Sequence, residues 1–285
     1  MTGLGELVLV GFAATLILWL GWKQGFFRWK PEAEWNRTIQ LYHVAAGFAV
    51  YFALSAVIPS LYTSWLQPYF PLPEGFIGYA TWLNFLLAAT IFAALVCVWR
   101  WLPQTVRDAI WRSKTAHQSY GQDLRISLFA WFLSFPTVLF INQLLEDFLY
   151  QVFGIEHIPD QIAVRFVKMT AEFPFYFFLA IITVVIFAPI IEEFLFRGLL
   201  QSFIRKHLGS KQAIFITALC FSFFHFSPEQ GLANIPIVAS LFPLALFLGF
   251  IYERQRSLMA SIGLHSLFNL LSIINLYFMG GIPCA

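Results

Sequence analysis

Long apolar stretches and short polar connections alternate along the chain. The apolar stretches cover residues about 5–22, 39–62, 78–99, 126–145, 173–191, 212–226, 232–251 and 257–280. A helix needs roughly 20 apolar residues to cross the hydrocarbon core of a bilayer, and the sixth stretch is the short one. Because each stretch is continuously apolar rather than alternating, a transmembrane β-barrel is excluded. The pattern predicts an all-α, polytopic membrane protein with about eight transmembrane helices.

Basic residues are distributed in a way that supports this count. Of the 17 Lys and Arg residues, all but Arg165 and Lys168 lie in the first, third, fifth and seventh connections. Cytoplasmic loops carry an excess of basic residues, so we expect these connections in the cytoplasm and both termini outside. The connection 103–122 is expected to be either an amphipathic helix on the inner membrane surface or a solvated loop. The connection 146–172 is expected to be an outer loop with a short helix.

Composition agrees with a membrane protein. Hydrophobic residues make up 59% of the chain and charged residues 11%, whereas soluble domains carry about 25% charged residues. The sequence contains no basic nucleic-acid patch and no Gly-rich phosphate loop, so membrane lipid is an expected partner and nucleic acid is not. We expect residues 1–150 to form a generic region of four spans. Residues 151–285 carry the polar side chains that suggest chemistry.

Two adjacent glutamates end the fifth apolar stretch, in Glu192-Glu193-Phe-Leu-Phe-Arg197. An ionisable residue inside a membrane is by default a candidate functional residue. Adjacent helical residues point about 100° apart, so the two glutamates are expected to have different roles. Arg197 follows Glu193 by four residues and should neutralise it, which leaves Glu192 free. Pro189 predicts a bend just before the pair. The alternative is a cytoplasmic helix end at which these charges meet water.

Three further polar residues lie in two other apolar stretches. His225 ends the segment that begins at Phe221, and His265 and Asn269 share one face of the last stretch. A single histidine is more often structural, and two polar residues on one face can simply join helices. However, Glu192, His225 and Asn269 lie about 20 Å from the inner boundary marked by basic residues, and His265 about 13 Å. Their similar depth favours one site.

The combination predicts a hydrolase that uses no protein nucleophile. A carboxylate beside an imidazole can deprotonate a water, and a second imidazole and an amide can donate hydrogen bonds to a developing oxyanion. Alternatively, Glu192, His225 and His265 could hold a divalent metal such as zinc with a water in the fourth position. The sequence contains no His-Glu-x-x-His and no Gly-x-Ser-Gly, and its four aspartates lie in connections. Other intramembrane protease chemistries are therefore disfavoured.

The three motifs Glu192-Glu193-x-x-x-Arg197, Phe221-x-x-x-His225 and His265-x-x-x-Asn269 resemble those of the CPBP family. This family comprises CAAX-processing proteases and bacteriocin-processing or self-immunity proteins, also called ABI-family intramembrane endopeptidases. The resemblance covers about residues 173–280, and the first four spans match only in number.

The resemblance implies a glutamic or metallo-type endopeptidase. Carried over by motif, Glu192 and His225 would activate water, and His265 and Asn269 would form the oxyanion hole. Glu193, Arg197 and Phe221 would support the site. The expected substrate is a membrane-associated or prenylated peptide or protein. We expect a bacterial plasma membrane and, from the basic residues, a site that opens to the cytoplasmic side.

Two alternatives use the same residues differently. The protein could be a non-catalytic membrane scaffold or a bacteriocin self-immunity protein, because the family contains members with no demonstrated proteolysis. A proton-coupled carrier could use Glu192 and the histidines as a relay. A carrier predicts repeats with matching broken helices, but the polar residues here are confined to the second half of the chain.

Overall fold

The computed structural model describes residues 4–28, 38–69, 71–73, 75–112, 119–155 and 158–278. Within these ranges no β-strand is present, and the only sheet-like feature is one isolated antiparallel bridge between Arg112 and Ser257. Seven of the described helical segments are long and apolar enough to cross a membrane: Gly5–Lys23, Leu41–Leu66, Phe76–Trp101, Tyr120–Phe153, Pro174–Leu208, Pro228–Gln255 and Leu258–Phe278. The protein is an all-α, polytopic membrane protein, as the apolar pattern predicts.

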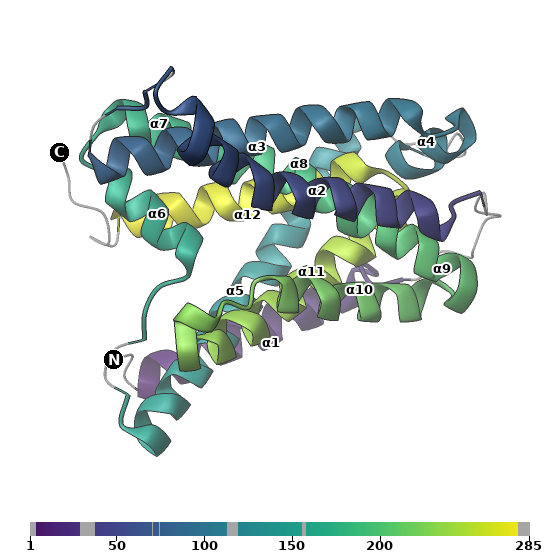
Figure 1. Ribbon diagram of the computed structural model, residues 1–285. Coiled ribbons are helices and arrows are strands. Elements are labelled where there is room, and N and C mark those ends of the chain that lie inside the picture. Colours follow the sequence, from purple (N-terminus) through teal and green to yellow (C-terminus); the bar gives the residue numbers. More distant parts are fainter. Residues whose placement is uncertain are drawn as a thin grey trace.

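Figure 1 labels the helices within these segments. The α-helices are α1 Leu4–Lys23, α2 Leu41–Leu61, α3 Phe76–Trp101, α4 Gln104–Trp111, α5 Tyr120–Phe153, α6 Ile162–Thr170, α7 Pro174–Ile181, α8 Ala188–Glu193, α9 Ser202–Leu208, α10 Ser210–Phe224, α11 Asn234–Gln255 and α12 Leu258–Phe278. Three π-helical segments, η1 Tyr62–Leu66, η2 Ile182–Phe187 and η3 Phe194–Gln201, and the 3₁₀ segment η4 Pro228–Ala233 complete the described secondary structure.

The sixth expected span is shorter than a membrane is thick. It forms α10, whose 15 residues extend about 22 Å, against a hydrocarbon core of about 30 Å. The helix ends before Pro228, and the amide of Asn234 binds both the N–H of Ser227 at 3.0 Å and its carbonyl at 2.7 Å. The expected eight spans are therefore seven long helices and one short apolar helix.

The fifth span is one continuous helix with two irregular stretches. Residues Pro174–Leu208 pass through α7, η2, α8, η3 and α9 without a break. The π-helical turn η2 ends two residues before Pro189, and the bend expected there stays a prediction. Proline cannot donate the regular backbone hydrogen bond, and a wider turn relieves this conflict. The pair Glu192 and Glu193 lies in the short α8, between two π-helical segments.

The structure has a helix in each of the connections 103–122 and 146–172. In the connection 103–122, α4 buries Val106 and Ile110, so this segment is an amphipathic helix packed on the protein. In the connection 146–172, α5 continues to Phe153, and α6 is the expected short helix.

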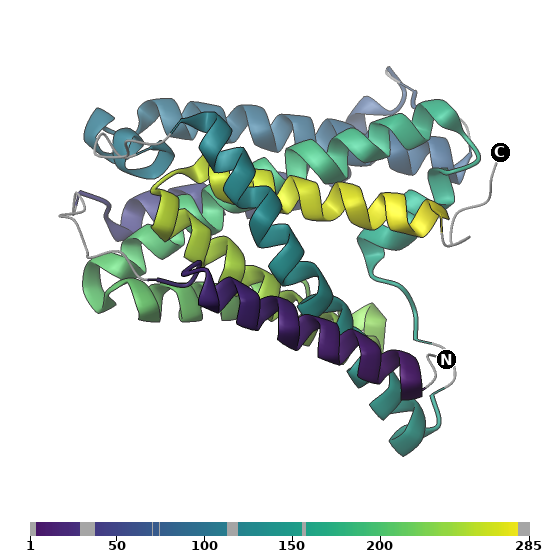
Figure 2. The same cartoon turned by 180° about the vertical axis from the view of Figure 1, so that it is seen from behind.

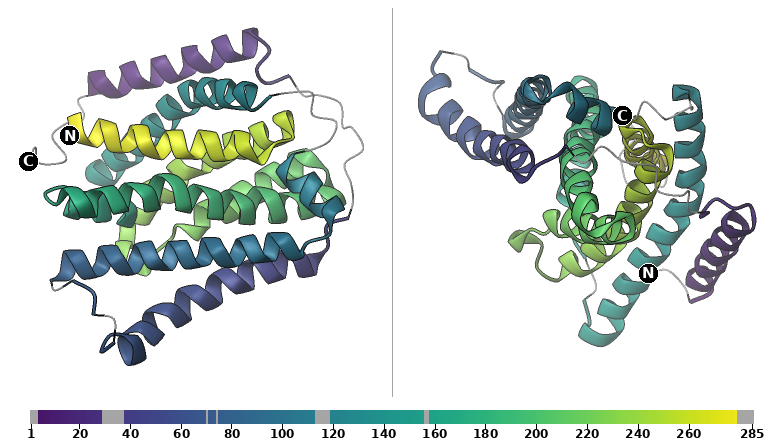
Figure 3. Two further views of the ribbon diagram at one scale, coloured as in Figure 1. Left: turned by 90° about the horizontal axis from the view of Figure 1, so that it is seen from above. Right: turned by 90° about the vertical axis from the view of Figure 1, so that its right-hand side faces the viewer.

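Most of the long helices lie in one row, and α10 and α11 cover its middle. The left view of Figure 3 shows the order α1, α5, α12, the helix Pro174–Leu208, α3 and α2. In Figure 2, α5 crosses the row obliquely, and it packs against α1, α11 and α12. The first and second halves of the chain thus share their packing surfaces. The division at residue 150 stays a prediction.

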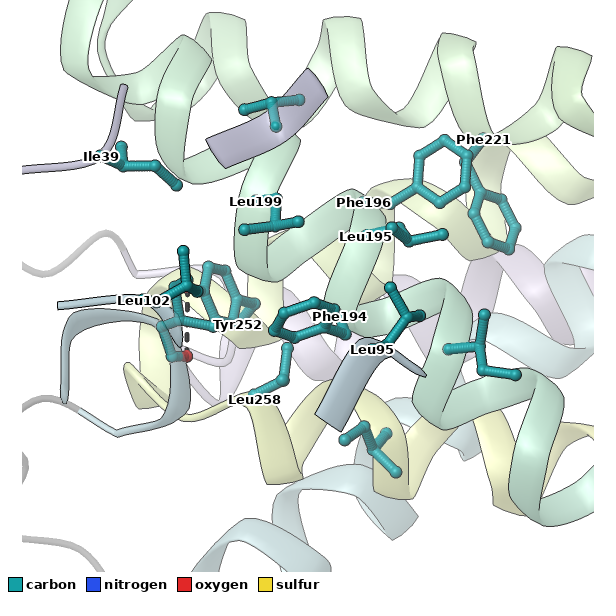
Figure 4. Packing of buried hydrophobic residues seen from close by; sticks show 14 of the residues in the cluster. Ile39, Leu95, Leu102, Phe194, Leu195, Phe196, Leu199, Phe221, Tyr252 and Leu258 are labelled. Carbon is teal, nitrogen blue, oxygen red and sulfur yellow. Dashed lines mark hydrogen bonds between the residues drawn. The ribbon is translucent and has the colours of Figure 1, made fainter. Parts of the chain in front are cut away.

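The largest hydrophobic cluster surrounds η3 (Figure 4). Leu195 and Leu199 are fully buried, and Phe196 is nearly so. On α2, Gly47 faces Leu199 so closely that a Cβ atom there would overlap its side chain. The segment that follows the two glutamates is therefore clamped by apolar packing.

A close contact between α5 and α12 positions the helix that carries His265. The Ser127 hydroxyl donates to the carbonyl of Ala260 at 2.7 Å, and a Cβ atom on Gly263 would lie 2.8 Å from this hydroxyl oxygen. We expect Gly263→Ala to lower the free energy of unfolding by about 1–3 kcal/mol, because the added methyl group overpacks this contact. Thermal unfolding in detergent measures the effect. Ser127→Ala removes the oxygen and should offset part of the loss in the double variant, so strictly additive effects would contradict this explanation.

Candidate active site

Three side chains from separate helices meet at one carboxylate oxygen. Oε2 of Glu192, on α8, lies 3.8 Å from Nε2 of His225 at the end of α10 and 3.9 Å from Nε2 of His265 on α12. The side chains of Glu192 and His225 are 16% and 18% exposed, and that of His265 is 6% exposed. Among the described residues, Oε2 of Glu192 has no hydrogen-bond partner. The structure thus brings together three of the four residues that the sequence placed at similar depth.

The backbone determines which nitrogen of His225 carries a proton. Its Nδ1 lies 2.9 Å from the carbonyl oxygen of Phe221. A carbonyl can only accept, so Nδ1 carries the hydrogen and the lone pair of Nε2 points towards Glu192 in the neutral ring. His225 follows α10 with φ −90° and ψ 0°, in the sparsely populated region where many active-site residues lie.

Glu193 is the buried anchor of the site. Its Oε1 accepts from Nη1 of Arg197 at 2.8 Å and lies 2.9 Å from Nδ1 of His265. Arg197 also donates to the carbonyl of Ala245 on α11 at 3.2 Å, and the side chains of Glu193 and Arg197 are both 0% exposed. The pair expected from the four-residue spacing is therefore present. Sequence reasoning missed the contact with His265, since no spacing rule relates α8 to α12.

Phe221 packs against the charged pair and both histidines. It is fully buried on α10, with its ring centroid 4.8 Å from that of His225 and 5.7 Å from that of His265. The guanidinium of Arg197 lies over the same ring at 4.4 Å. A buried cation–π contact of this kind contributes up to about 2 kcal/mol. One aromatic ring thus fixes the positions of three polar side chains.

Asn269 lies one turn beyond His265 and has a backbone partner. Its Nδ2 donates to the carbonyl of Val184 in η2 at 2.9 Å. A π-helical turn displaces backbone carbonyls from their regular partners, so this bond compensates for the irregular helix. An amide has two N–H groups, and the second can serve another acceptor. The structure therefore places Asn269 on the face of His265 but not among the three converging groups.

The spacing of the three converging groups does not suit a shared metal ion. A tetrahedral zinc with bonds of about 2.0–2.2 Å keeps its oxygen and nitrogen ligands roughly 3.3–3.5 Å apart, less than the two separations from Glu192. Across the described ranges, no three His, Cys, Asp or Glu side chains are arranged to hold a metal ion.

Comparisons with known proteins match the part of the chain that holds these residues. Residues 174–271 match the family model described as "Type II CAAX prenyl endopeptidase Rce1-like". A curated protein of Lactococcus lactis subsp. cremoris, named "UPF0177 protein in abiGi 5'region", is 35% identical over 94 residues. This match covers 33% of the chain and 37% of that protein, so the chain spans little more than a third of the length of the relative. No solved structure matches the chain.

The matched segment contains the three motifs in full. It begins on α7, before the two glutamates, and ends on α12, just beyond Asn269. The resemblance inferred from the motifs is confirmed, because residues 174–271 match the model of an Rce1-like CAAX prenyl endopeptidase family.

Proposed function

We propose that the protein is a CAAX-type intramembrane endopeptidase in which Glu192 and His225 activate a water molecule. The observation that carries this proposal is the unpartnered Oε2 of Glu192, which faces two imidazole nitrogens. The carboxylate oxygen and Nε2 of His225 are both acceptors, and their separation of 3.8 Å is too long for a direct hydrogen bond. One water that donates a hydrogen to each of them bridges this distance.

In the proposed reaction, Glu192 and His225 act on the bridging water. Glu192 takes a proton from the water as the water oxygen attacks the peptide carbonyl carbon. The new C–O bond forms, and the electrons of the C=O double bond move onto the carbonyl oxygen. When the tetrahedral intermediate collapses, the C–N bond breaks and the proton held by Glu192 passes to the leaving nitrogen. His225 orients the water through its second hydrogen.

His265 and Asn269 are proposed to stabilise the oxyanion. Both project from one face of α12, and the Nδ1 of His265 is held by Glu193. In its doubly protonated form, His265 can donate from Nε2, and Asn269 can donate the N–H that Val184 does not use. Removal of one such donor from a hydrolase typically costs about 10²–10³ in kcat.

The proposed substrate is a membrane-associated peptide, with a prenylated C-terminal peptide as the first choice. The Rce1-like match of residues 174–271 supports this class. We also propose that substrate reaches the site from the cytoplasmic half of the membrane. Support comes from the basic residues of the odd connections, which include Arg205 and Lys206 at the end of the helix that carries Glu192.

Glu192→Gln is expected to abolish cleavage without unfolding the protein, because the substitution keeps the volume and removes the base. The loss should be on the order of 10²–10⁴ in kcat. The measurement is cleavage of prenylated and unprenylated peptides by purified protein in liposomes, with thermal unfolding measured in parallel. Glu229→Gln, at an exposed glutamate, is the matched control and should retain wild-type turnover.

Two results would contradict this assignment. Near-normal turnover by the Glu192→Gln variant would remove Glu192 as the base. A wild-type protein that binds these peptides in the same liposomes but cleaves none would favour the scaffold or self-immunity alternative.

Arg197→Ala is expected to reduce stability as well as activity. The variant leaves the buried carboxylate of Glu193 without its charged partner, which can cost about 3–5 kcal/mol. The double variant Arg197→Met with Glu193→Gln removes both charges and should melt at a higher temperature than Arg197→Ala. An inactive Arg197→Ala variant that melts like the wild type would instead indicate that Arg197 binds substrate directly.

Cysteine labelling in intact cells tests the proposed orientation. Gln212, at the start of α10, and Glu229, beyond its end, are both exposed. On a background with Cys97, Cys220 and Cys284 replaced (the last lies outside the described residues), an impermeant thiol reagent should label Glu229→Cys but not Gln212→Cys. After permeabilisation both should react. Labelling of Gln212→Cys alone in intact cells would invert the orientation and the proposed route of access.

A further inference from the structure

A second buried polar network follows the active site along the same helix. Nε2 of Gln201, the last residue of η3, donates to the carbonyl of Gly249 at 3.0 Å and to Oε1 of Glu253 at 2.9 Å. Nη1 of Arg205 donates to the same Oε1 at 3.1 Å. Gln201 is 0% exposed, and Arg205 and Glu253 are each 9% exposed. None of these residues belongs to the three motifs.

Together with the contact of Arg197, this network joins the helix Pro174–Leu208 to α11 at regular intervals. Side chains four residues apart on the helix Pro174–Leu208 reach α11 at positions that are also four residues apart: Arg197 at Ala245, Gln201 at Gly249 and Arg205 at Glu253. An apolar seam would join the two helices without the cost of burying charges. Polar contacts, in contrast, are satisfied in only one register, so this seam specifies how the helices align.

The π-helical segment η3 makes this alignment important. A π-helical turn holds one more residue than an α-helical turn, and its backbone geometry is the rarer one. If η3 relaxed to a regular α-helix, the side chains on either side of it would rotate by about 100° relative to one another. Glu192 and Glu193 lie directly before η3. A contact that fixes the end of η3 therefore fixes the direction in which the two glutamates point.

Gly249 allows the helices to come close enough for this contact. A Cβ atom at this position would lie 2.8 Å from Oε1 of Gln201 and 3.2 Å from Cγ2 of Ile214. A methyl group there would push the amide of Gln201 away from its two partners. The glycine, the amide and the carboxylate of Glu253 form a unit, which we name the inner clasp.

We propose that Gln201, held by the inner clasp, is a positioning residue of the active site. It holds η3 one turn after Arg197, and so keeps Glu193 against His265 and Glu192 opposite the two Nε2 atoms. The effect on catalysis rests on the proposed function. The effect on the contact between Glu193 and His265 does not, so the two can be tested separately.

The experiment compares Gln201→Met with Ser210→Ala. Gln201→Met keeps the length of the side chain and removes the donor. Ser210→Ala removes a hydrogen bond of 3.2 Å to the other oxygen of Glu253 but no contact with η3. The NMR signals of ¹⁵N-labelled histidine in detergent report the proton on Nδ1 of His265, and His265→Gln assigns them. Thermal unfolding and peptide cleavage are measured on the same samples.

We expect Gln201→Met to shift or broaden the His265 Nδ1 signal and to lower kcat on the order of tenfold to a hundredfold with little change in KM, since a small misplacement of catalytic groups has effects of this size. Gly249→Ala should do the same, whereas Ser210→Ala should leave the signal and kcat unchanged. The proposal is overturned if the signal and kcat of Gln201→Met are those of the wild type, or if Ser210→Ala changes them equally. A signal that responds in a protein without proteolysis would retain the inner clasp and reject only the proposed function.

Discussion

The rest of the site depends on the contacts that the carboxylate of Glu193 makes with Arg197 and His265. The carboxylate is fully buried, and one of its oxygens is shared between Arg197 and His265. A charge in such a place is tolerated only with partners, because removal from water costs several kcal/mol per ion. The partners in turn connect three helices, since Arg197 also binds the carbonyl of Ala245 on α11. The helix Pro174–Leu208, α11 and α12 are thus held together through the carboxylate of Glu193.

This arrangement explains how two adjacent glutamates can differ so much. Oε1 of Glu193 is bound to Arg197 and His265 at 2.8 and 2.9 Å, whereas Oε2 of Glu192 lies 3.8 and 3.9 Å from the two imidazole nitrogens that it faces. The difference arises because neighbouring residues on a helix point in different directions. The carboxylate of Glu193 faces Arg197 and Nδ1 of His265, and the carboxylate of Glu192 faces the two Nε2 atoms. The buried contacts of Glu193 therefore hold in place the backbone that carries Glu192.

The sequence predicted the parts of this architecture that depend on local spacing. Apolar length identified the long helices, and four-residue spacing identified the pair of Glu193 and Arg197. Spacing also placed His265 and Asn269 on one face of α12. The depth estimate, which assumed regular α-helices, predicted one site formed by Glu192, His225, His265 and Asn269, and the structure brings the first three together.

The features that the sequence could not predict depend on irregular backbone or on contacts between distant helices. Nothing in a periodic pattern signals a π-helical turn, so neither η2 nor η3 was expected, and the bond from Asn269 to Val184 depends on the first of them. The short α10 was counted as a full span because its residues are apolar. Gln201 and Glu253 resemble ordinary polar residues near a helix end, and only their 2.9 Å contact shows that they are paired inside the protein.

Phe221 contributes to the site through two parts that respond differently to mutation. Its carbonyl determines the tautomer of His225, and every amino acid has a carbonyl. Its ring determines how both imidazoles and the guanidinium of Arg197 are oriented, and only an aromatic side chain supplies that surface. The location of the proton on His225 is therefore robust to substitution at this position, whereas the alignment of the groups around it is not. Evolution can tune the geometry of such a site without disturbing its protonation pattern.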